Sequence, residues 1–214
     1  MSNGVRLIFL LLIPSAVLMG VLAEPITRLV YERGVFGSGA TDLVSEAMVW
    51  WAISLPFQGV SLLFSRTFFS LQRTWATIGP MALNMSLNAA LAAALYKPLG
   101  IGGIVLGTVV GTIAMCALQG HMLRGSLGGI EGRRTALAVA RMLVAAAPLA
   151  GVAYGAWYGL DDLLGGGLGG QLVAVGAGLG LGVAAYAGAA WLLRIPEARQ
   201  FRSLLPGSRS PSSG

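Results

Sequence analysis

The sequence predicts an all-α membrane protein, a polytopic helix bundle that crosses the bilayer about six times, with roughly 20 apolar residues in each span. Three observations lead there: the composition, a series of long apolar segments and the distribution of arginine. Hydrophobic residues make up 56% of the chain and charged residues only 10%, with a mean hydropathy of +0.77. A soluble domain carries about 25% charged residues, so this chain lacks the polar surface that water requires.

The apolar segments follow one another with short polar or Gly/Pro-containing breaks. The first contains Pro14 and Pro25, and its length favours a retained span over a cleaved signal peptide. The fourth contains no formal charge. The predicted segments are 5–30, 43–71, 75–96, 101–123, 136–160 and 168–193.

Arginine placement predicts the orientation, because basic residues concentrate on the cytoplasmic side of a membrane protein. With the N-terminus in the cytoplasm, only Arg28, Arg33 and Lys97 of the 14 basic residues lie outside. Most acidic residues fall on the opposite side. An even number of spans then places both termini in the cytoplasm, and residues 201–214, rich in Ser, Pro and Gly, are expected to form a disordered cytoplasmic tail.

The same inventory argues against several functional classes. The net charge of +6 comes from residues at segment ends, so nucleic acid is not an expected partner. Cys116 is the only cysteine and His121 the only histidine, which excludes an intrachain disulfide and a zinc cluster. No nucleotide-binding fingerprint, acid pair or nucleophile–base set lies within the spans. We therefore expect neither an enzyme nor an organic cofactor.

Small residues recur at helical spacing in three of the segments, and this spacing allows helices to approach closely within lipid. Such stripes build most polytopic bundles whatever their function. The stripes are Gly103, Gly107 and Gly111; Gly151, Gly155 and Gly159; and Gly176, Gly180, Ala184 and Gly188.

Polar residues inside the spans are the candidate functional residues, because each is costly in lipid unless it faces protein or water. Arg66 and Arg141 lie a few residues inside predicted cytoplasmic ends. They either extend to the interface or line a cavity for an anionic group. Asn84 and Asn88 share a helix face and are expected to face the bundle interior, where they bond neighbouring helices or bind an ion or a substrate hydroxyl. Arg28 forms an i,i+4 pair with Glu32.

Several segments resemble the MurJ/MviN family of lipid II flippases. Residues 22–36 resemble a family pattern in which a span ends in L-A-x-P-I and continues to an R/Y-G-x-F motif. Residues 65–74 resemble the segment after the next span, and residues 84–88 and 98–108 resemble the following two helices. The resemblance covers residues 5–200, and its strength lies in the order and spacing of these motifs.

The resemblance implies a flippase that moves undecaprenyl-linked peptidoglycan precursor, lipid II, across the bacterial cytoplasmic membrane by alternating access. It is driven by membrane potential or ions rather than ATP. Residues 1–127 would be four helices of its C-terminal lobe, and residues 128–200 two appended helices forming a groove for the lipid tail. The rest of the flippase, its N-terminal part, is absent, so the chain is expected to be incomplete alone. Arg28, Arg66, Arg141 and Asn84 are the substrate-cavity candidates.

The resemblance also suggests a sodium site, held in some members by an Asn, an Asp one turn later, a carbonyl and a Thr. The matching positions are Asn88, Ala92, Ile104 and Thr108. Ala92 replaces the Asp, so one charged ligand is missing and the earlier helix that supplies a further acid is absent.

Two alternatives to lipid II transport remain. One is a flippase for another polyprenyl-linked polysaccharide unit, although the appended two helices favour lipid II. The other is a non-transporting membrane scaffold in cell-wall assembly.

Overall fold

The computed structural model describes residues 2–31, 38–126, 132–164 and 167–193. Within these ranges the ordered elements are all helical, and the all-α prediction is confirmed. The predicted tail at 201–214 lies outside the described residues. The elements are α1 (Ser2–Val21), α2 (Ala23–Tyr31), α3 (Ser38–Ser70), a 3₁₀ turn η1 (Thr74–Thr77), α4 (Ile78–Ser126), α5 (Gly132–Leu164) and α6 (Leu168–Leu192).

The first apolar segment is two helices rather than the single span predicted over 5–30. α1 ends at Val21 and the separate nine-residue α2 begins at Ala23. Pro25 explains the break, because it has no N–H to donate to the carbonyl of Val21 and its ring crowds that carbonyl. Pro14 is accommodated inside α1, so the two prolines of one segment have different effects.

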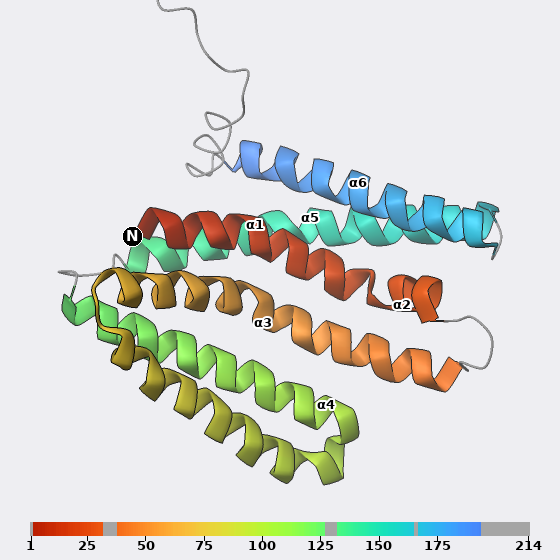
Figure 1. Cartoon of the computed structure of the whole chain (residues 1–214). Coiled ribbons are helices and arrows are strands. Elements are labelled where there is room, and N and C mark those ends of the chain that lie inside the picture. Colours follow the sequence, from red (N-terminus) through yellow and green to blue (C-terminus); the bar gives the residue numbers. More distant parts are fainter. Residues whose placement is uncertain (1, 32–37, 127–131, 165–166, 194–214) are drawn as a thin grey trace, which may run out of the picture.

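α4 folds back on itself at Gly100. It is 49 residues long, and Gly100 has φ 56° and ψ −131°, a conformation far from helical. Only glycine adopts this region without strain. The two legs of α4, residues 78–99 and 101–126, run side by side in opposite directions (Figure 1).

Five helices of the described residues are long and apolar enough to cross a membrane. Because α4 supplies two of the crossings, the bundle crosses about six times, as the composition and segment lengths predict.

α1 occupies the centre of the bundle. It packs against α3 on one side and α5 on the other, while α4 packs on α3 and α6 on α5 (Figure 1). Two apolar cores result. One joins α1, α5 and α6 and includes Leu22, Met142 and Leu149; the other joins α1, α3 and α4 and includes Phe68 and Leu123. α1 therefore holds the two halves together.

The two ends of the bundle carry opposite charge. α1 and α5 begin, and α3, α4 and α6 end, at the same end of the bundle (Figure 1). The described charged side chains at that end are all arginines: Arg6, Arg66, Arg73, Arg124, Arg134 and Arg141. At the other end are Glu24, Asp42, Glu46, Asp161 and Asp162, together with Arg28 and Lys97. Which end faces the cytoplasm stays a prediction.

Only one of the three small-residue stripes packs within the chain. A Cβ on Gly107 would lie 3.0 Å from the carbonyl oxygen of Asn88, and one on Gly111 would lie 2.9 Å from that of Asn84. These glycines let the two legs of α4 touch. The stripes beginning at Gly151 and Gly176 face outward instead, and a Cβ placed on any of their glycines would meet no other helix within 4 Å.

α6 packs through a different stripe, which is not one of the three predicted from spacing. A Cβ on Gly178 would lie 3.0 Å from the carbonyl oxygen of Ala153, and one on Gly182 would lie 3.1 Å from the Ala153 Cβ. Several small-residue stripes coexist on α6, so spacing alone cannot select the face that is buried.

Candidate functional site

An apolar groove lies where α1, α3 and α5 meet. Its volume is about 410 Å³, within the range of about 300–1,000 Å³ typical of ligand sites. Val49, Ile53 and Leu143 on its wall are exposed, so the groove opens to the surroundings. It is lined by Phe9, Ile13, Ala16, Val17, Gly20, Val21, Val49, Ala52, Ile53, Pro56, Phe57, Val139 and Leu143.

Small side chains at the crossing of α1 and α3 create this groove. Gly20 faces Ala52, with only 4.0 Å between the Ala52 Cβ and a Cβ placed on the glycine. Phe9 and Phe57 stack edge-to-face nearby, with ring centroids 6.2 Å apart. The lining side chains carry no polar group, so the groove suits a hydrocarbon chain held by dispersion and the hydrophobic effect.

Arg6 lies on the groove side of α1, at the arginine-rich end of the bundle. It precedes Phe9 and Ile13 by three and seven residues, so the three share a helix face. Arg6 is half-buried. Arg6 is not among the predicted site residues, although its i, i+3, i+7 relationship to Phe9 and Ile13 is visible in the sequence.

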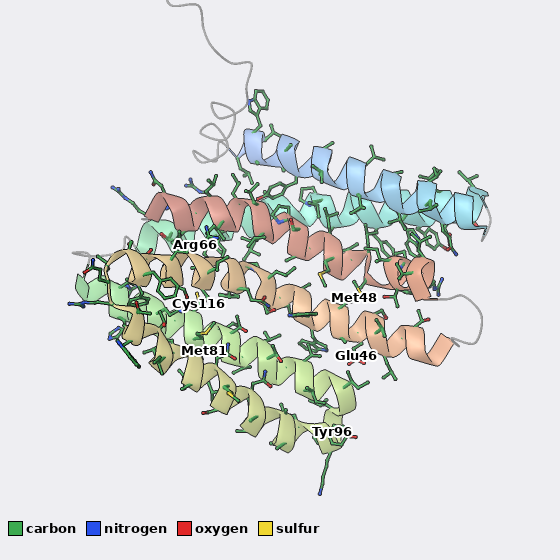
Figure 2. The ribbon with its side chains drawn as sticks, viewed as in Figure 1. Glu46, Met48, Arg66, Met81, Tyr96 and Cys116 are labelled. Carbon is green, nitrogen blue, oxygen red and sulfur yellow. The ribbon has the colours of Figure 1, made fainter. Side chains whose placement is uncertain are left out.

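Arg66 and Arg141 are both exposed at the arginine-rich end, and neither forms an ion pair with a described residue. Arg66 and Glu46 lie toward opposite ends of α3 (Figure 2). Val139 and Leu143, two residues to either side of Arg141, line the groove. Side chains two positions apart point about 160–200° around a helix, so Arg141 faces away from the groove. The structure does not bring these two arginines together.

Arg28 lies at the acidic end, on α2. Its Nη2 is 2.6 Å from Oε1 of Glu24, and both side chains are nearly half exposed. The expected partner Glu32 lies outside the described residues. Arg28 also shares a small polar recess with Asp161 and Gln171, so acidic groups surround its charge. This placement suits a surface ion pair better than an anion site.

Asn84 and Asn88 face the bundle interior, as their shared helix face predicts. The amide nitrogen of Asn88 donates to the Thr108 hydroxyl oxygen at 2.9 Å, and that of Asn84 contacts the Met115 sulfur at 3.6 Å. Both therefore join the two legs of α4.

The residues matched to the sodium site lie close together but fit a sodium ion poorly. The Thr108 hydroxyl accepts from the Asn88 amide nitrogen and donates to the Ile104 carbonyl oxygen at 3.4 Å, so the Thr108 and Ile104 oxygens are engaged within the protein. Ala92 offers no oxygen, whereas a hard cation requires oxygen ligands. Among the described residues, no group of three His, Cys, Asp or Glu side chains could hold a metal ion.

Glu46 is a further ionisable residue within a candidate span. A Cβ on Gly102 would lie 3.1 Å from Oε1 of Glu46, and the Trp50 indole nitrogen is also close. The second leg of α4 begins beside Gly102, and a carboxylate is favourable near a helix N-terminus. The sequence predicts for Glu46 only a place on the outer side, with most of the other acidic residues.

Comparison with known proteins identifies the family. The family model described as "Lipid II flippase MurJ" matches residues 1–161, which takes in α1 to most of α5. The chain belongs to the lipid II flippase MurJ family. The resemblance found in the sequence motifs is thereby confirmed.

Individual relatives agree at modest identity. A protein from Rhizobium tropici named "Probable lipid II flippase MurJ" is 28% identical over 174 residues, covering 78% of this chain and 31% of the relative. One of the same name from Synechocystis sp. is 30% identical over 130 residues, covering 60% and 24%. The "Lipid II flippase MurJ" of Thermosipho africanus is 30% identical over 74 residues, covering 35% and 16%. The chain spans less than a third of the length of these relatives.

Proposed function

We propose that this chain forms the C-terminal part of a lipid II flippase. The complete flippase moves undecaprenyl-linked peptidoglycan precursor from the inner to the outer leaflet of the bacterial cytoplasmic membrane. Alternating access between two lobes needs more helices than this bundle contains, so the transport step requires the part of the relatives that lies outside the matched region.

The observation that carries the proposal is the apolar groove between α1, α3 and α5. A polyprenyl tail is a long hydrocarbon chain, and a groove of about 410 Å³ lined by apolar side chains can hold several of its units. The tail enters between Val49 and Leu143, which are exposed on opposite walls.

The anionic headgroup lies at the arginine-rich end in this proposal. Arg6 shares the groove face of α1, so a tail seated along Phe9 and Ile13 brings its phosphate to that side chain. Guanidinium groups bind phosphate oxygens in pairs of hydrogen bonds. Arg66 and Arg141 lie at the same end but outside the groove lining, so in this proposal they shape the cavity or contact the headgroup only together with the further helices of the complete flippase.

Photo-crosslinking tests the tail site directly. The complete flippase, reconstituted in bilayers, is exposed to undecaprenyl phosphate carrying a diazirine in its tail. We expect crosslinks on α1 and α3 that fall severalfold in Val49→Trp, because the indole fills the groove. Val183→Trp is the matched control, since Val183 is similarly exposed on α6 and lies outside the groove. Equal labelling of both variants would refute the tail site.

Depletion of the full-length gene tests the transported substrate. We expect lipid II to become inaccessible at the outer surface while it accumulates inside the cell. Unchanged exposure of lipid II with loss of another polyprenyl-linked glycan would identify a flippase for that glycan. Unchanged exposure of both would favour the scaffold role.

A further inference from the structure

Pro14 interrupts the hydrogen bonding of α1 near its centre. Proline has no backbone N–H, so the carbonyl of Leu10, four residues earlier, loses its normal helical donor. In the apolar interior of a membrane bundle, water cannot replace that donor.

Tyr186 of α6 supplies the missing donor. Its hydroxyl donates to the carbonyl oxygen of Leu10 at 3.1 Å, across 176 positions of sequence. Tyr186 is buried, with 7% of its surface exposed. The bond thus joins an early helix to the last one, at the point where proline has weakened α1.

α6 is shaped to bring Tyr186 to this carbonyl. Gly178, Gly182 and Tyr186 lie four residues apart on one face. A Cβ on Gly182 would lie 3.0 Å from Cδ2 of Leu18, so the absence of a side chain lets α6 approach α1 closely. The close packing of α6 on α1 at Gly182 therefore places the Tyr186 hydroxyl within hydrogen-bonding distance of the Leu10 carbonyl oxygen.

The same part of α1 forms a wall of the groove. Phe9 and Ile13 line the groove on one side, while the carbonyl of Leu10 accepts from Tyr186 on α6. A bend of α1 at this point therefore moves both the groove wall at Phe9 and Ile13 and the Leu10 carbonyl.

We propose that Pro14 and Tyr186 form a latch that sets the bend of α1 and with it the width of the groove. With the hydroxyl on the Leu10 carbonyl, α1 is held against α6. On release, α1 bends at Pro14, the usual site of a helix kink, and Phe9 and Ile13 move relative to α3. The latch does not depend on which lipid occupies the groove, so it stands apart from the proposed function.

A double-mutant cycle tests the latch. Tyr186→Phe removes only the hydroxyl. Pro14→Ala returns an N–H to position 14, which can then donate to the Leu10 carbonyl. Spin labels are attached at Leu11→Cys on α1 and Leu62→Cys on α3, both exposed, in a Cys116→Ala background of the complete flippase in bilayers.

Tyr186→Phe should broaden and shift the distance distribution between the labels, because α1 is released. In the Pro14→Ala background the same substitution should leave the distribution unchanged, because Leu10 keeps a donor. An equal shift in both backgrounds, or none in either, would overturn the latch.

A second measurement reports on the hydrogen bond itself rather than on the position of α1. Carbonyl ¹³C labelling of Leu10 reports its hydrogen bond by solid-state NMR. We expect Tyr186→Phe to shift this resonance when position 14 is proline, and to shift it little when position 14 is alanine. A resonance insensitive to Tyr186 in the proline form would show that the hydroxyl does not serve this carbonyl.

Discussion

The hydroxyl of Ser61 on α3 donates a 2.6 Å hydrogen bond to the side-chain oxygen of Gln119 on α4. The Gln119 amide nitrogen donates in turn to the Ser65 hydroxyl at 3.1 Å. Ser61 and Gln119 are almost fully buried. One amide thus connects α4 to two successive turns of α3, close to the arginine-rich end.

Gln119→Leu should therefore destabilise the bundle. It removes both interhelical hydrogen bonds and replaces the amide with an apolar side chain of similar size. Interhelical hydrogen bonds in membranes contribute about 0.6–1.7 kcal/mol each, so we expect a loss of about 1–2 kcal/mol. Unfolding by denaturing detergent in mixed micelles measures it. Thr67→Val is the control, because the Thr67 hydroxyl bonds only to Leu63 of its own helix; an equal loss there would contradict the assignment.

Gly107→Ala should destabilise the hairpin of α4. The added methyl would lie 3.0 Å from the Asn88 carbonyl oxygen and 3.2 Å from the Ala92 nitrogen, so the legs must separate. Overpacking of this kind costs about 1–3 kcal/mol. Detergent unfolding again provides the measurement.

Gly155→Ala is the matched control for that substitution. Nothing lies within 4 Å of the added methyl on α5, and alanine is the better helix former by up to about 1 kcal/mol. We expect stability of the isolated chain to be unchanged or slightly raised. A clear loss would show that the outward stripe packs within this chain.

Sodium should not stabilise this chain. If sodium bound the folded chain, a sodium concentration 100 times its dissociation constant would add about 2.7 kcal/mol to the free energy of unfolding. A thermal scan readily detects a change of that size. We expect the same melting temperature in sodium chloride and choline chloride. Ala92→Asp places a carboxylate one turn from Asn88 and should make the melting temperature depend on sodium; a sodium effect already present with Ala92 would show that the site forms without the acid.

The arginine-rich end should face the cytoplasm. Thr74→Cys lies in η1 at that end and Lys97→Cys beside the Gly100 reversal at the other, and both positions are exposed. With Cys116 replaced by alanine, a membrane-impermeant maleimide added to intact cells should label position 97 but not position 74. Labelling of position 74 alone would reverse the predicted topology.

The helical architecture follows from the sequence because segment length and apolarity determine what can cross a bilayer. The reversal at Gly100 also follows, since Pro98 and Gly100 sit between two apolar segments. The break at Leu22 was missed, because Pro14 and Pro25 have the same sequence signature in one apolar run. Only the surroundings decide which proline is tolerated, and Pro14 has Tyr186 of α6 beside its orphaned carbonyl.

The candidate site was less predictable for a similar reason. Periodicity shows which residues share a face, but not which helix covers it. Asn84 and Asn88 were placed correctly because an amide facing lipid is costly. The groove requires α1, α3 and α5 to meet, and the sequence separation of Phe9, Ile53 and Leu143 gives no sign of that meeting. Glycine spacing failed on α6 because Gly176 and Gly178 begin two competing stripes.

The central place of α1 has a consequence for the order in which the protein is made. α1 leaves the ribosome before every other helix described here, yet its hydrogen-bond partner Tyr186 is synthesised 176 positions after Leu10. Until α6 enters the membrane, the Leu10 carbonyl of α1 lacks the Tyr186 donor, and the side of α1 that packs on α6 is uncovered. Tyr186 can therefore complete the hydrogen bonding of α1 only after α6, the last of the described helices, has entered the membrane.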